Sequence, residues 1–597
     1  MNPSARPIVA LSPEASLAGT ATRLPFWWPI SPTPSPANGF STWWRPAGLD
    51  ELQGLASWGD RLLALEGRRG YLLELDPIAQ TFRILNPNWA WQLRDSHAVA
   101  VESGPEGSLI ALWFACHLAV YRVACTDLES LATIADLEAY RCWQAPFGVE
   151  SLAIGSLGVY ATCYAREKIL LLDPGTGELI QEWPAPGIGH EHLMLQDQAL
   201  WVSDRTEETL FVLDPKTGRE MARILSPWPH PTGIATWRDQ IWVAAATRED
   251  YIYDSPNDPI PLSVDNRPKT LVAPLRLTDP SSVQHMSNPT TAALEWAAGN
   301  RAFYTLSGGY RVEMTYLEEV DQEEPRDLLG LEWRIALPVN SRRQVVRSVM
   351  PLGQPFRLET EQDQSVAVYS LGSLQPQTSR LFGWRAVLDL YNIKYLITPA
   401  DVENARLPPE LARQYLIDDD ELAMDHPLVK AAAHEAIGTE TNLLRKMSNI
   451  RRFVYDKLSY RVTPRIDPPD LVLTRGIGSC GEYVGVLLAL ARLNGIACRT
   501  VGRYKCPPQP ELKGVPLYAQ YNHVWIEFYL PGFGWVPMES NVDDLGDGPH
   551  PQRYFMGLSW THAEIAKGIP FETINRDDVS LGQLAINHVQ FRILEEI

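Results

Sequence analysis

A repeat of about 40 residues runs through the first half of this chain and constrains its fold more than any other feature. Three copies align without gaps: LLALEGRRGYLLELD (62–76), VYATCYAREKILLLD (159–173) and LWVSDRTEETLFVLD (200–214). IWVAAATREDYIYD (241–254) is one residue shorter, and a degenerate copy fits between 98 and 125. Each copy has two strand-like apolar runs around a polar turn. Such a unit cannot bury its apolar face alone, so successive units must stack on one another.

Short strands repeated at this period predict an all-β propeller over residues 50–275, with five readable blades. Three copies end in an Asp-Pro turn, at Asp76, Asp173 and Asp214. The D-P-x-T-G form of two of these turns resembles the YVTN/NHL-like propellers. A sixth blade could be completed by the N-terminal arm, residues 1–49, or by residues 255–275.

One polar residue stands two positions before the first apolar position of each repeat. These residues are Gln53, His97, Glu150, Glu191 and Thr232. The innermost strands of a propeller line its channel, so these side chains could form a ring that binds a metal or ligand, and the propeller could then be a metal-dependent, lyase-like enzyme. A solvated channel mouth is the simpler interpretation, because single carboxylates and histidines are common on wet surfaces.

Alternating apolar and polar residues predict a small antiparallel β-sandwich over 300–398. The alternating segments are 310–317, 331–337, 345–349, 365–370 and 384–390. Residues 399–425 are an acidic linker containing Pro, and its Asp418-Asp419-Asp420-Glu421 run is predicted to be a solvated face rather than a metal site. Two helices should follow, the first with Pro427 at an early position and the second capped by Thr441.

The run GSCGEYVGVLLALARLNG, residues 478–495, predicts a buried helix with Cys480 in its first turn. The apolar residues at helical spacing are Val484, Leu487, Leu488 and Ala491. Ser479 suits the N-cap, Gly495 suits the end of the helix, and residues 471–473 before it read as a strand. A thiol at a helix N-terminus lies near unpaired N–H groups and the positive end of the helix dipole, which favour the nucleophilic thiolate.

A thiolate nucleophile needs a base and a group that orients the base. NHVWIEFYLPGFGWVPMES, residues 522–540, predicts two strands around a turn at 531–534. His523 begins the first strand and Glu539 ends the second, 16 residues later, so we expect the two side chains opposite each other within about one position of register. Glu539 could then hold the imidazole for Cys480.

These blocks, with GIACRTVGRY at 495–504, closely resemble the transglutaminase-like family, whose motifs read roughly G-x-C, G-I-P-A-R-x-x-x-G-Y, H-a-W-v-E and G-W-v-p-x-D. The resemblance implies an α+β papain-like catalytic domain over 426–597 with a Cys-His-Asp triad. It makes Cys480 the nucleophile and His523 the base, and it places Glu539 where the orienting aspartate stands.

Two positions depart from the family pattern. Glu539 is one methylene longer than aspartate, so its carboxylate must fold back or shift to meet the imidazole. Arg503 stands where the family usually has glycine and could narrow or charge the cleft. Asp543 and Asp544 are close enough in sequence to be substitute partners for the histidine. His562, by contrast, has no partner at a recognisable spacing.

The resemblance implies thiol-dependent acyl transfer or hydrolysis on peptide or carboxamide bonds, with no cofactor. Water as the acceptor would make the protein a cysteine peptidase or amidase, and an amine would make it a transferase. The substrate would be a protein or peptide, and the propeller would bind the substrate or a protein partner. The alternative is a catalytically inactive transglutaminase-like scaffold that binds peptides.

Composition limits the partners and the compartment. A net charge of -20 opposes binding to nucleic acid and to anionic membranes. Seven cysteines without a C-x-x-C pair favour neither a disulfide framework nor a zinc ribbon. No apolar run is long enough for a signal peptide or a membrane span, so we expect a cytoplasmic protein. We also expect no bound metal.

Overall fold

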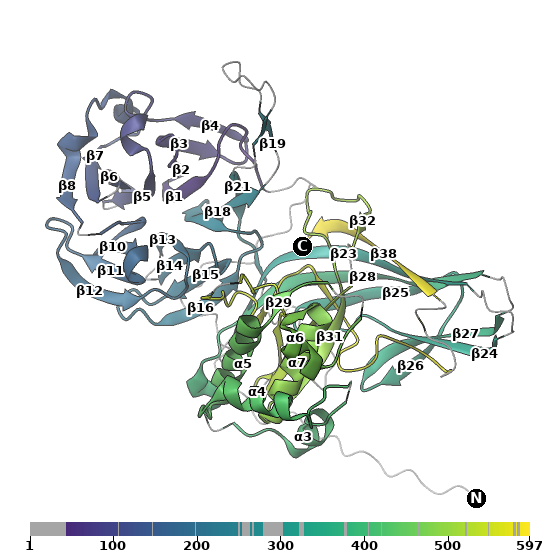
Figure 1. Cartoon of the computed structure of the whole chain (residues 1–597). Coiled ribbons are helices and arrows are strands. Elements are labelled where there is room, and N and C mark those ends of the chain that lie inside the picture. Colours follow the sequence, from purple (N-terminus) through teal and green to yellow (C-terminus); the bar gives the residue numbers. More distant parts are fainter. Residues whose placement is uncertain are drawn as a thin grey trace, which may run out of the picture.

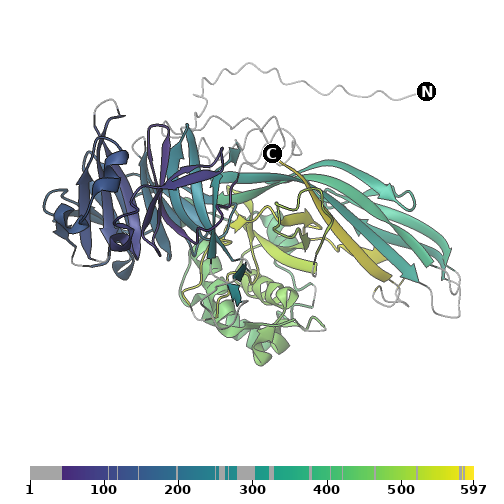
Figure 2. The ribbon, with the colours of Figure 1, turned by 90° about the horizontal axis from the view of Figure 1, so that it is seen from above.

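The computed structural model places a ring of small sheets, a long sandwich and a helical part side by side (Figure 1). It describes residues 43–278 and 303–597, apart from gaps at 105–106, 117, 146, 197–198, 249–250, 254–262, 266–267, 322–327, 375–378, 404, 420, 463–464, 520–521, 547, 577–580 and 582–584. Most of the predicted N-terminal arm therefore lies outside the described residues. Seen from above, the ring and the sandwich extend in opposite directions, and the helical part projects between them (Figure 2).

Five antiparallel sheets follow one another over residues 52–274. In chain order they contain β1 (Leu52–Trp58), β2 (Arg61–Glu66), β3 (Tyr71–Asp76) and β4 (Thr81–Ile84); β5 (Ser96–Ser103), β6 (Leu109–Cys116), β7 (Ala119–Ala124) and β8 (Arg141–Gln144); β9 (Ser151–Gly155), β10 (Gly158–Cys163), β11 (Lys168–Leu172) and β12 (Leu179–Pro184); β13 (His190–Gln196), β14 (Ala199–Asp204), β15 (Thr209–Leu213) and β16 (Glu220–Leu225); and β17 (Pro231–Trp237), β18 (Gln240–Arg248) and β21 (Pro268–Pro274). The first strands β1, β5, β9, β13 and β17 pack against one another in this order, and β17 contacts β1, which closes the ring. The predicted series of small antiparallel sheets is confirmed.

The fifth sheet corrects one repeat of the sequence analysis. We expected 241–254 to contain two paired strands, but β18 runs on to Arg248 and pairs with β21. The aromatic segment β19 (Tyr251–Tyr253) instead pairs with β20 (Ser263–Asp265) in a separate ribbon. Trp44 forms a bridge to Val272 of β21, so both segments proposed for a sixth blade complete the fifth sheet.

The Asp-Pro turns have a simple local cause. The Oδ1 atom of Asp173 accepts hydrogen bonds from the N–H groups of Gly175 and Thr176, each at 2.9 Å. Asp76 and Asp214 cap their turns in the same way. An aspartate that bonds the backbone two residues on mimics a backbone turn, which explains why this residue recurs at these positions.

A two-sheet sandwich follows the ring, as predicted, and shares one core between its sheets. One sheet contains β25 (Gln344–Leu352), β28 (Ser379–Tyr395), β23 (Tyr304–Asp321), β38 (Ala585–Glu596) and β32 (Leu517–Tyr518), with β22 (Leu277–Thr278) and β35 (Gly557–Leu558) paired to β23 and β28. The other contains β26 (Arg357–Glu361), β27 (Gln364–Leu374), β24 (Leu328–Ala336) and β37 (Glu572–Ile574). β37 and β38 come from the segment assigned to the catalytic domain, so the C-terminal strands return to the sandwich, which the sequence analysis did not anticipate.

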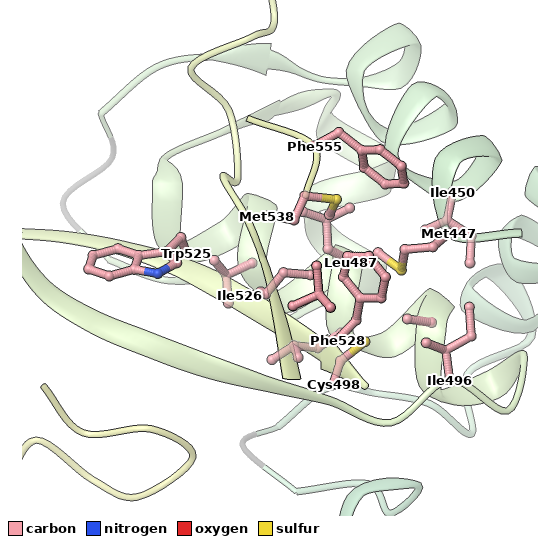
Figure 3. Close-up of a cluster of buried hydrophobic side chains, with 14 of the residues drawn as sticks. Met447, Ile450, Leu487, Ile496, Cys498, Trp525, Ile526, Phe528, Met538 and Phe555 are labelled. Carbon is pink, nitrogen blue, oxygen red and sulfur yellow. The ribbon is translucent and has the colours of Figure 1, made fainter. Parts of the chain in front are cut away.

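The helical part packs on the four-stranded sheet β34-β33-β31-β36. Its elements are α3 (Pro409–Tyr415), α4 (Pro427–Ile437), α5 (Leu443–Lys457), α6 (Pro469–Arg475), α7 (Cys480–Leu493), β29 (Ser459–Tyr460), β30 (Ile477–Gly478), β31 (Cys498–Lys505), β33 (Asn522–Leu530), β34 (Gly534–Met538) and β36 (His562–Ile565). Side chains of α5 and α7 meet those of β31, β33 and β34 in a buried core (Figure 3). Two local predictions were wrong: residues 471–473 lie on α6, and Asn442 rather than Thr441 caps α5.

The ring contacts the rest of the protein through its fourth sheet. β16 packs beside β23 and β28. Between β14 and β15, Glu207 accepts the N–H of Gln552 at 2.7 Å, and Glu208 binds the guanidinium of Arg553 at 2.7 Å. Arg553 also binds Asp543, four residues after Glu539. Buried polar contacts therefore link the ring to the segment that follows the predicted site.

In the part of the chain that the structure describes, no helix has the length and apolar character needed to cross a membrane.

Candidate active site

Cys480 is the first residue of α7, as the sequence predicts. Ser479 caps the helix through a capping box with Glu482, whose carboxylate accepts the Ser479 N–H at 2.7 Å. Cys480 and Gly481 lie in the first turn, where backbone N–H groups have no partner within the helix. Cys480 is partly exposed, whereas Cys498 and Cys506 are buried in the core. Cys480 thus combines a helix N-terminus with access for a substrate.

The hairpin of β33 and β34 brings the two other predicted residues together. Leu530 pairs with Gly534 and Ile526 with Met538, so the hairpin is centred one residue later than expected. Glu539 therefore reaches diagonally to His523, and its Oε1 lies 2.5 Å from His523 Nε2. Both side chains are buried. The longer glutamate side chain suits this diagonal reach.

The electrostatics of the three groups are mutually dependent. Burial alone would lower the pKa of His523, but the charge of Glu539 and the contact with Cys480 raise it to about 9. Burial would raise the pKa of Glu539, but the charge and hydrogen bond of His523 hold it well below its usual value. Burial likewise opposes ionisation of Cys480, yet hydrogen bonding with His523 lowers the thiol's pKa. The site favours a thiolate beside an imidazolium.

His562 belongs to the same cluster, although no sequence motif indicates it. Its Nε2 lies 2.9 Å from Oε1 of Glu539, and its ring is fully buried. Burial lowers the pKa of His562 to about 3. The residue comes from β36, which pairs with β31 so that His562 lies opposite Lys505. No motif at a fixed spacing could have indicated this edge strand.

The aromatic residues of the hairpin have different surroundings. Trp525 is buried beside both imidazoles, with ring centroids 6.2 Å from His523 and 4.9 Å from His562. Trp535 instead packs under the guanidinium of Arg499 at 4.1 Å. Trp525 is therefore the tryptophan that borders the cluster.

The other candidates occupy separate places. Asp543 binds Arg451 and Arg553, and Asp544 accepts the hydroxyl of Tyr483, so neither substitutes for Glu539. The guanidinium of Arg503 lies over the ring of Phe571, with its Cζ 4.9 Å from the centroid. In the acidic run, Asp419 pairs with Arg492 of α7. These charges serve packing between elements.

His523, Glu539 and His562 are also, among the described residues, the only group of three ligand atoms within 4.8 Å of one another. Ligands that bind zinc tetrahedrally at about 2.0–2.1 Å lie about 3.3 Å apart. The two nitrogens are 2.5 and 2.9 Å from one carboxylate oxygen, which are hydrogen-bond separations. The cluster is built by hydrogen bonds.

Three of the polar residues predicted for the ring channel, Glu150, Glu191 and Thr232, have partners within the ring. Glu191 lies 4.0 Å from Arg205, which binds Glu51 at 2.5 Å, and burial raises the pKa of Glu191 to about 7. Glu150 accepts the N–H of Tyr164 at 3.2 Å. Gln53, His97 and Thr232 lie on β1, β5 and β17. Among the described residues, the histidine and carboxylates of this set (His97, Glu150 and Glu191) belong to no group of three converging ligand atoms, which disfavours the metal-dependent, lyase-like alternative.

Comparisons with known proteins agree with this geometry. The transglutaminase-like superfamily model matches residues 430–540. An uncharacterised protein of Haemophilus influenzae is 29% identical over 163 residues, which cover 23% of this chain and 44% of that protein. The chain thus spans less than half the length of this relative.

Two solved structures are similar only at a coarse level. A proposed cysteine protease of Cytophaga hutchinsonii is 14% identical, covering 49% of this chain and 93% of that chain with a TM-score of 0.34. A glutaminyl cyclase of Myxococcus xanthus is 11% identical, covering 40% and 97% with a TM-score of 0.28. Scores this low decide nothing about function. The family model is more informative: residues 430–540, which it matches as a transglutaminase-like domain, include Cys480, His523 and Glu539.

Proposed function

We propose that this protein is a thiol-dependent enzyme that transfers or hydrolyses acyl groups of peptide or carboxamide substrates through Cys480, His523 and Glu539. The observation that carries the proposal is the buried hydrogen bond between Glu539 and His523, whose charges act on a cysteine at a helix N-terminus. Glu539 fixes one ring nitrogen of His523, which leaves Nδ1 for the thiol of Cys480. Nucleophile, base and orienting group are the parts that covalent acyl transfer needs.

The reaction follows from these roles. The Cys480 thiolate attacks the substrate carbonyl carbon, and the negative charge on the carbonyl oxygen lies near the N–H groups at the start of α7. The C–N bond breaks as the His523 imidazolium gives its proton to the leaving amine, and a thioester remains on Cys480. Water or a second amine then attacks the thioester while His523 takes its proton, and the thiolate leaves. Glu539 stabilises the imidazolium in each half of the cycle.

Both acyl acceptors fit this chemistry. With water the product is a carboxylic acid, and with an amine it is a new amide. Hydroxylamine added to a turnover assay separates the two: a hydroxamate that forms at the expense of the acid shows that amines reach the thioester.

We further propose that the ring of five sheets is a β-propeller that binds the protein substrate or a partner. The closed order of its innermost strands supports a propeller. A binding ring predicts that substitutions on it raise KM and leave kcat unchanged.

The pH dependence of iodoacetamide alkylation at Cys480 tests the enzymatic proposal, with the modified peptide identified by mass spectrometry. We expect fast alkylation well below the free-thiol pKa of about 8.5, and slow alkylation in His523→Ala. Alkylation that follows an ordinary thiol in both proteins would refute the thiolate–imidazolium pair and favour an inactive, peptide-binding scaffold.

A further inference from the structure

Glu539 needs more restraint than an aspartate at the same place, because its side chain has one more rotatable bond. The structure supplies donors to both of its oxygens. Oε2 accepts the N–H of Ser540 at 2.7 Å, and Oε1 accepts from His523 and from His562. Of the two histidines that donate to Glu539, His562 has no role in the proposed reaction.

The proton of His562 can be assigned from its neighbours. The ring is neutral at physiological pH and so carries one N–H. Nδ1 faces the carbonyl oxygen of Ser559 at 3.2 Å and the hydroxyl of Thr561 at 3.3 Å, whereas Nε2 faces the Glu539 carboxylate at 2.9 Å. A charged acceptor makes the stronger hydrogen bond, and the Ser559 carbonyl already accepts from Arg343 at 2.8 Å. The proton therefore belongs on Nε2, and Nδ1 can accept the Thr561 hydroxyl.

The position of His562 is set by the sandwich. Arg343, a buried residue directly before β25, donates from its guanidinium to the carbonyl oxygens of His562 at 2.9 Å and of Tyr391 at 2.8 Å. The same guanidinium binds Glu564 of β36 at 3.0 Å. These bonds fix β36 to the sandwich, and the edge of the Trp525 ring packs against the His562 imidazole.

We propose that His562 is a positioning residue: its Nε2–H binds Oε1 of Glu539 and holds this longer carboxylate where it can orient His523. The proposal rests on the proposed function, since orientation of His523 matters only if His523 serves Cys480. It also gives the sandwich a purpose, because Arg343 places the strand that carries His562.

Loss of this hydrogen bond should change how Cys480 titrates. Without the His562 donor the Glu539 side chain can rotate away, and its charge then supports the His523 imidazolium less. The charged and titratable groups around the cluster are Lys505 of β31, Cys480 of α7, His523 of β33, Tyr455 of α5 and Tyr554. Lys505 Nζ, 3.7 Å from Oε1, would then oppose the imidazolium with less compensation from Glu539.

The test compares the alkylation profile of Cys480 in the native chain, His562→Leu and His562→Gln. The leucine variant removes the donor, and the glutamine variant keeps an N–H at similar reach. We expect the upper inflection of the profile, where His523 loses its proton, to fall by about one pH unit or more in His562→Leu. His562→Gln should recover most of this fall. Turnover by His562→Leu should show a lower kcat at unchanged KM.

A second histidine–carboxylate pair serves as the matched control. His588 binds Glu319 at 2.7 Å on the surface of the sandwich, so His588→Gln should leave the profile unchanged. A native profile in folded His562→Leu would overturn the inference while the proposed function stands. An ordinary-thiol profile in the native chain, unchanged by His523→Ala, would overturn both.

A measurement on the native chain covers the case in which His562→Leu fails to fold. Nitrogen-15 chemical shifts of labelled histidine distinguish the two tautomers of a neutral ring, with the His562 signals assigned from their loss in His562→Gln. We expect the Nε2–H tautomer, unprotonated at Nδ1 down to pH 5. The Nδ1–H tautomer would place a lone pair against the carboxylate and would overturn the inference.

Discussion

Replacing Glu539 by aspartate, the residue of the family motif, should weaken this site rather than restore it. The change removes one methylene and draws the carboxylate back by about 1.3 Å. The oxygen now 2.5 Å from His523 Nε2 and 2.9 Å from His562 Nε2 would move beyond hydrogen-bond range of both. An aspartate would suit a hairpin whose register brings this position closer to the histidine than Glu539 is to His523.

The magnitude follows from the pKa of His523. Its rise from an ordinary 6.5 to about 9 corresponds to about 3 kcal/mol of preference for the imidazolium, in which the Glu539 charge is the largest favourable cause. If that support is lost, the protonated fraction of His523 at pH 7 falls from nearly complete to about one quarter. Cys480 then approaches a free thiol, of which about 3% is thiolate at pH 7, so alkylation should slow by up to about 30-fold.

The assay is again iodoacetamide alkylation of Cys480 between pH 5 and 10, now in Glu539→Asp and Glu539→Gln. The glutamine variant keeps the length and removes the charge, so it separates reach from electrostatics. Both variants should be slow at neutral pH. A Glu539→Asp protein that reacts as fast as the native chain, with its upper inflection still near pH 9, would refute the reasoning that side-chain length matches the diagonal register.

Three further predictions concern stability. His562 stays neutral in the folded protein down to about pH 3, whereas the same residue in the unfolded chain binds a proton near pH 6.5. The free energy of unfolding, measured by urea denaturation, should therefore decrease as the pH is lowered below about 6.5, by at most about 1.4 kcal/mol per pH unit. A free energy that does not change with pH in this range would contradict the prediction. His523 has the opposite shift, so its stabilisation is complete below pH 6.5 and is lost as pH rises through about 9; this alkaline loss should be absent in His523→Ala. Glu208→Gln should lower Tm, because it removes a negative charge that pairs with the largely buried guanidinium of Arg553. Glu220→Gln, which removes the charge from the less buried Glu220–Arg223 pair of the same sheet, should change Tm little. Equal effects of the two substitutions would argue against coupling of the ring to residues 540–553.

The contact between Glu208 and Arg553 limits what a deletion of the ring could show. Arg553 joins Glu208 to Asp543, and the adjacent Tyr554 carbonyl accepts the N–H of Glu539 at 3.1 Å. Deletion of residues 1–275 would therefore disturb the backbone that holds Glu539 as well as any substrate bound by the ring. Point substitutions on the ring separate these effects.

Local features of the site could be predicted because neighbouring residues determine them. The N-cap at Ser479, the apolar spacing of α7 and the turn of the β33–β34 hairpin all lie within a few residues of sequence. The strand predicted at 471–473 was wrong, since three apolar residues cannot distinguish a strand from a short helix, and Pro469 begins α6 there. The centre of the hairpin also lies one residue later than expected, which moves the cross-strand pairing by two positions and makes the Glu539–His523 contact diagonal.

The sequence by itself determined the helix that begins at Cys480, the strand of His523, the place of Glu539 after the second strand and the repeated small sheets. Only the tertiary structure decided that His562 meets Glu539, that Arg343 of the sandwich holds the strand of His562, and that β38 returns to pair with β23. Periodicity and turn chemistry act over a few residues, so they can be recognised in the chain. Pairings between segments tens or hundreds of residues apart depend on which apolar faces and buried charges fit together once the elements pack.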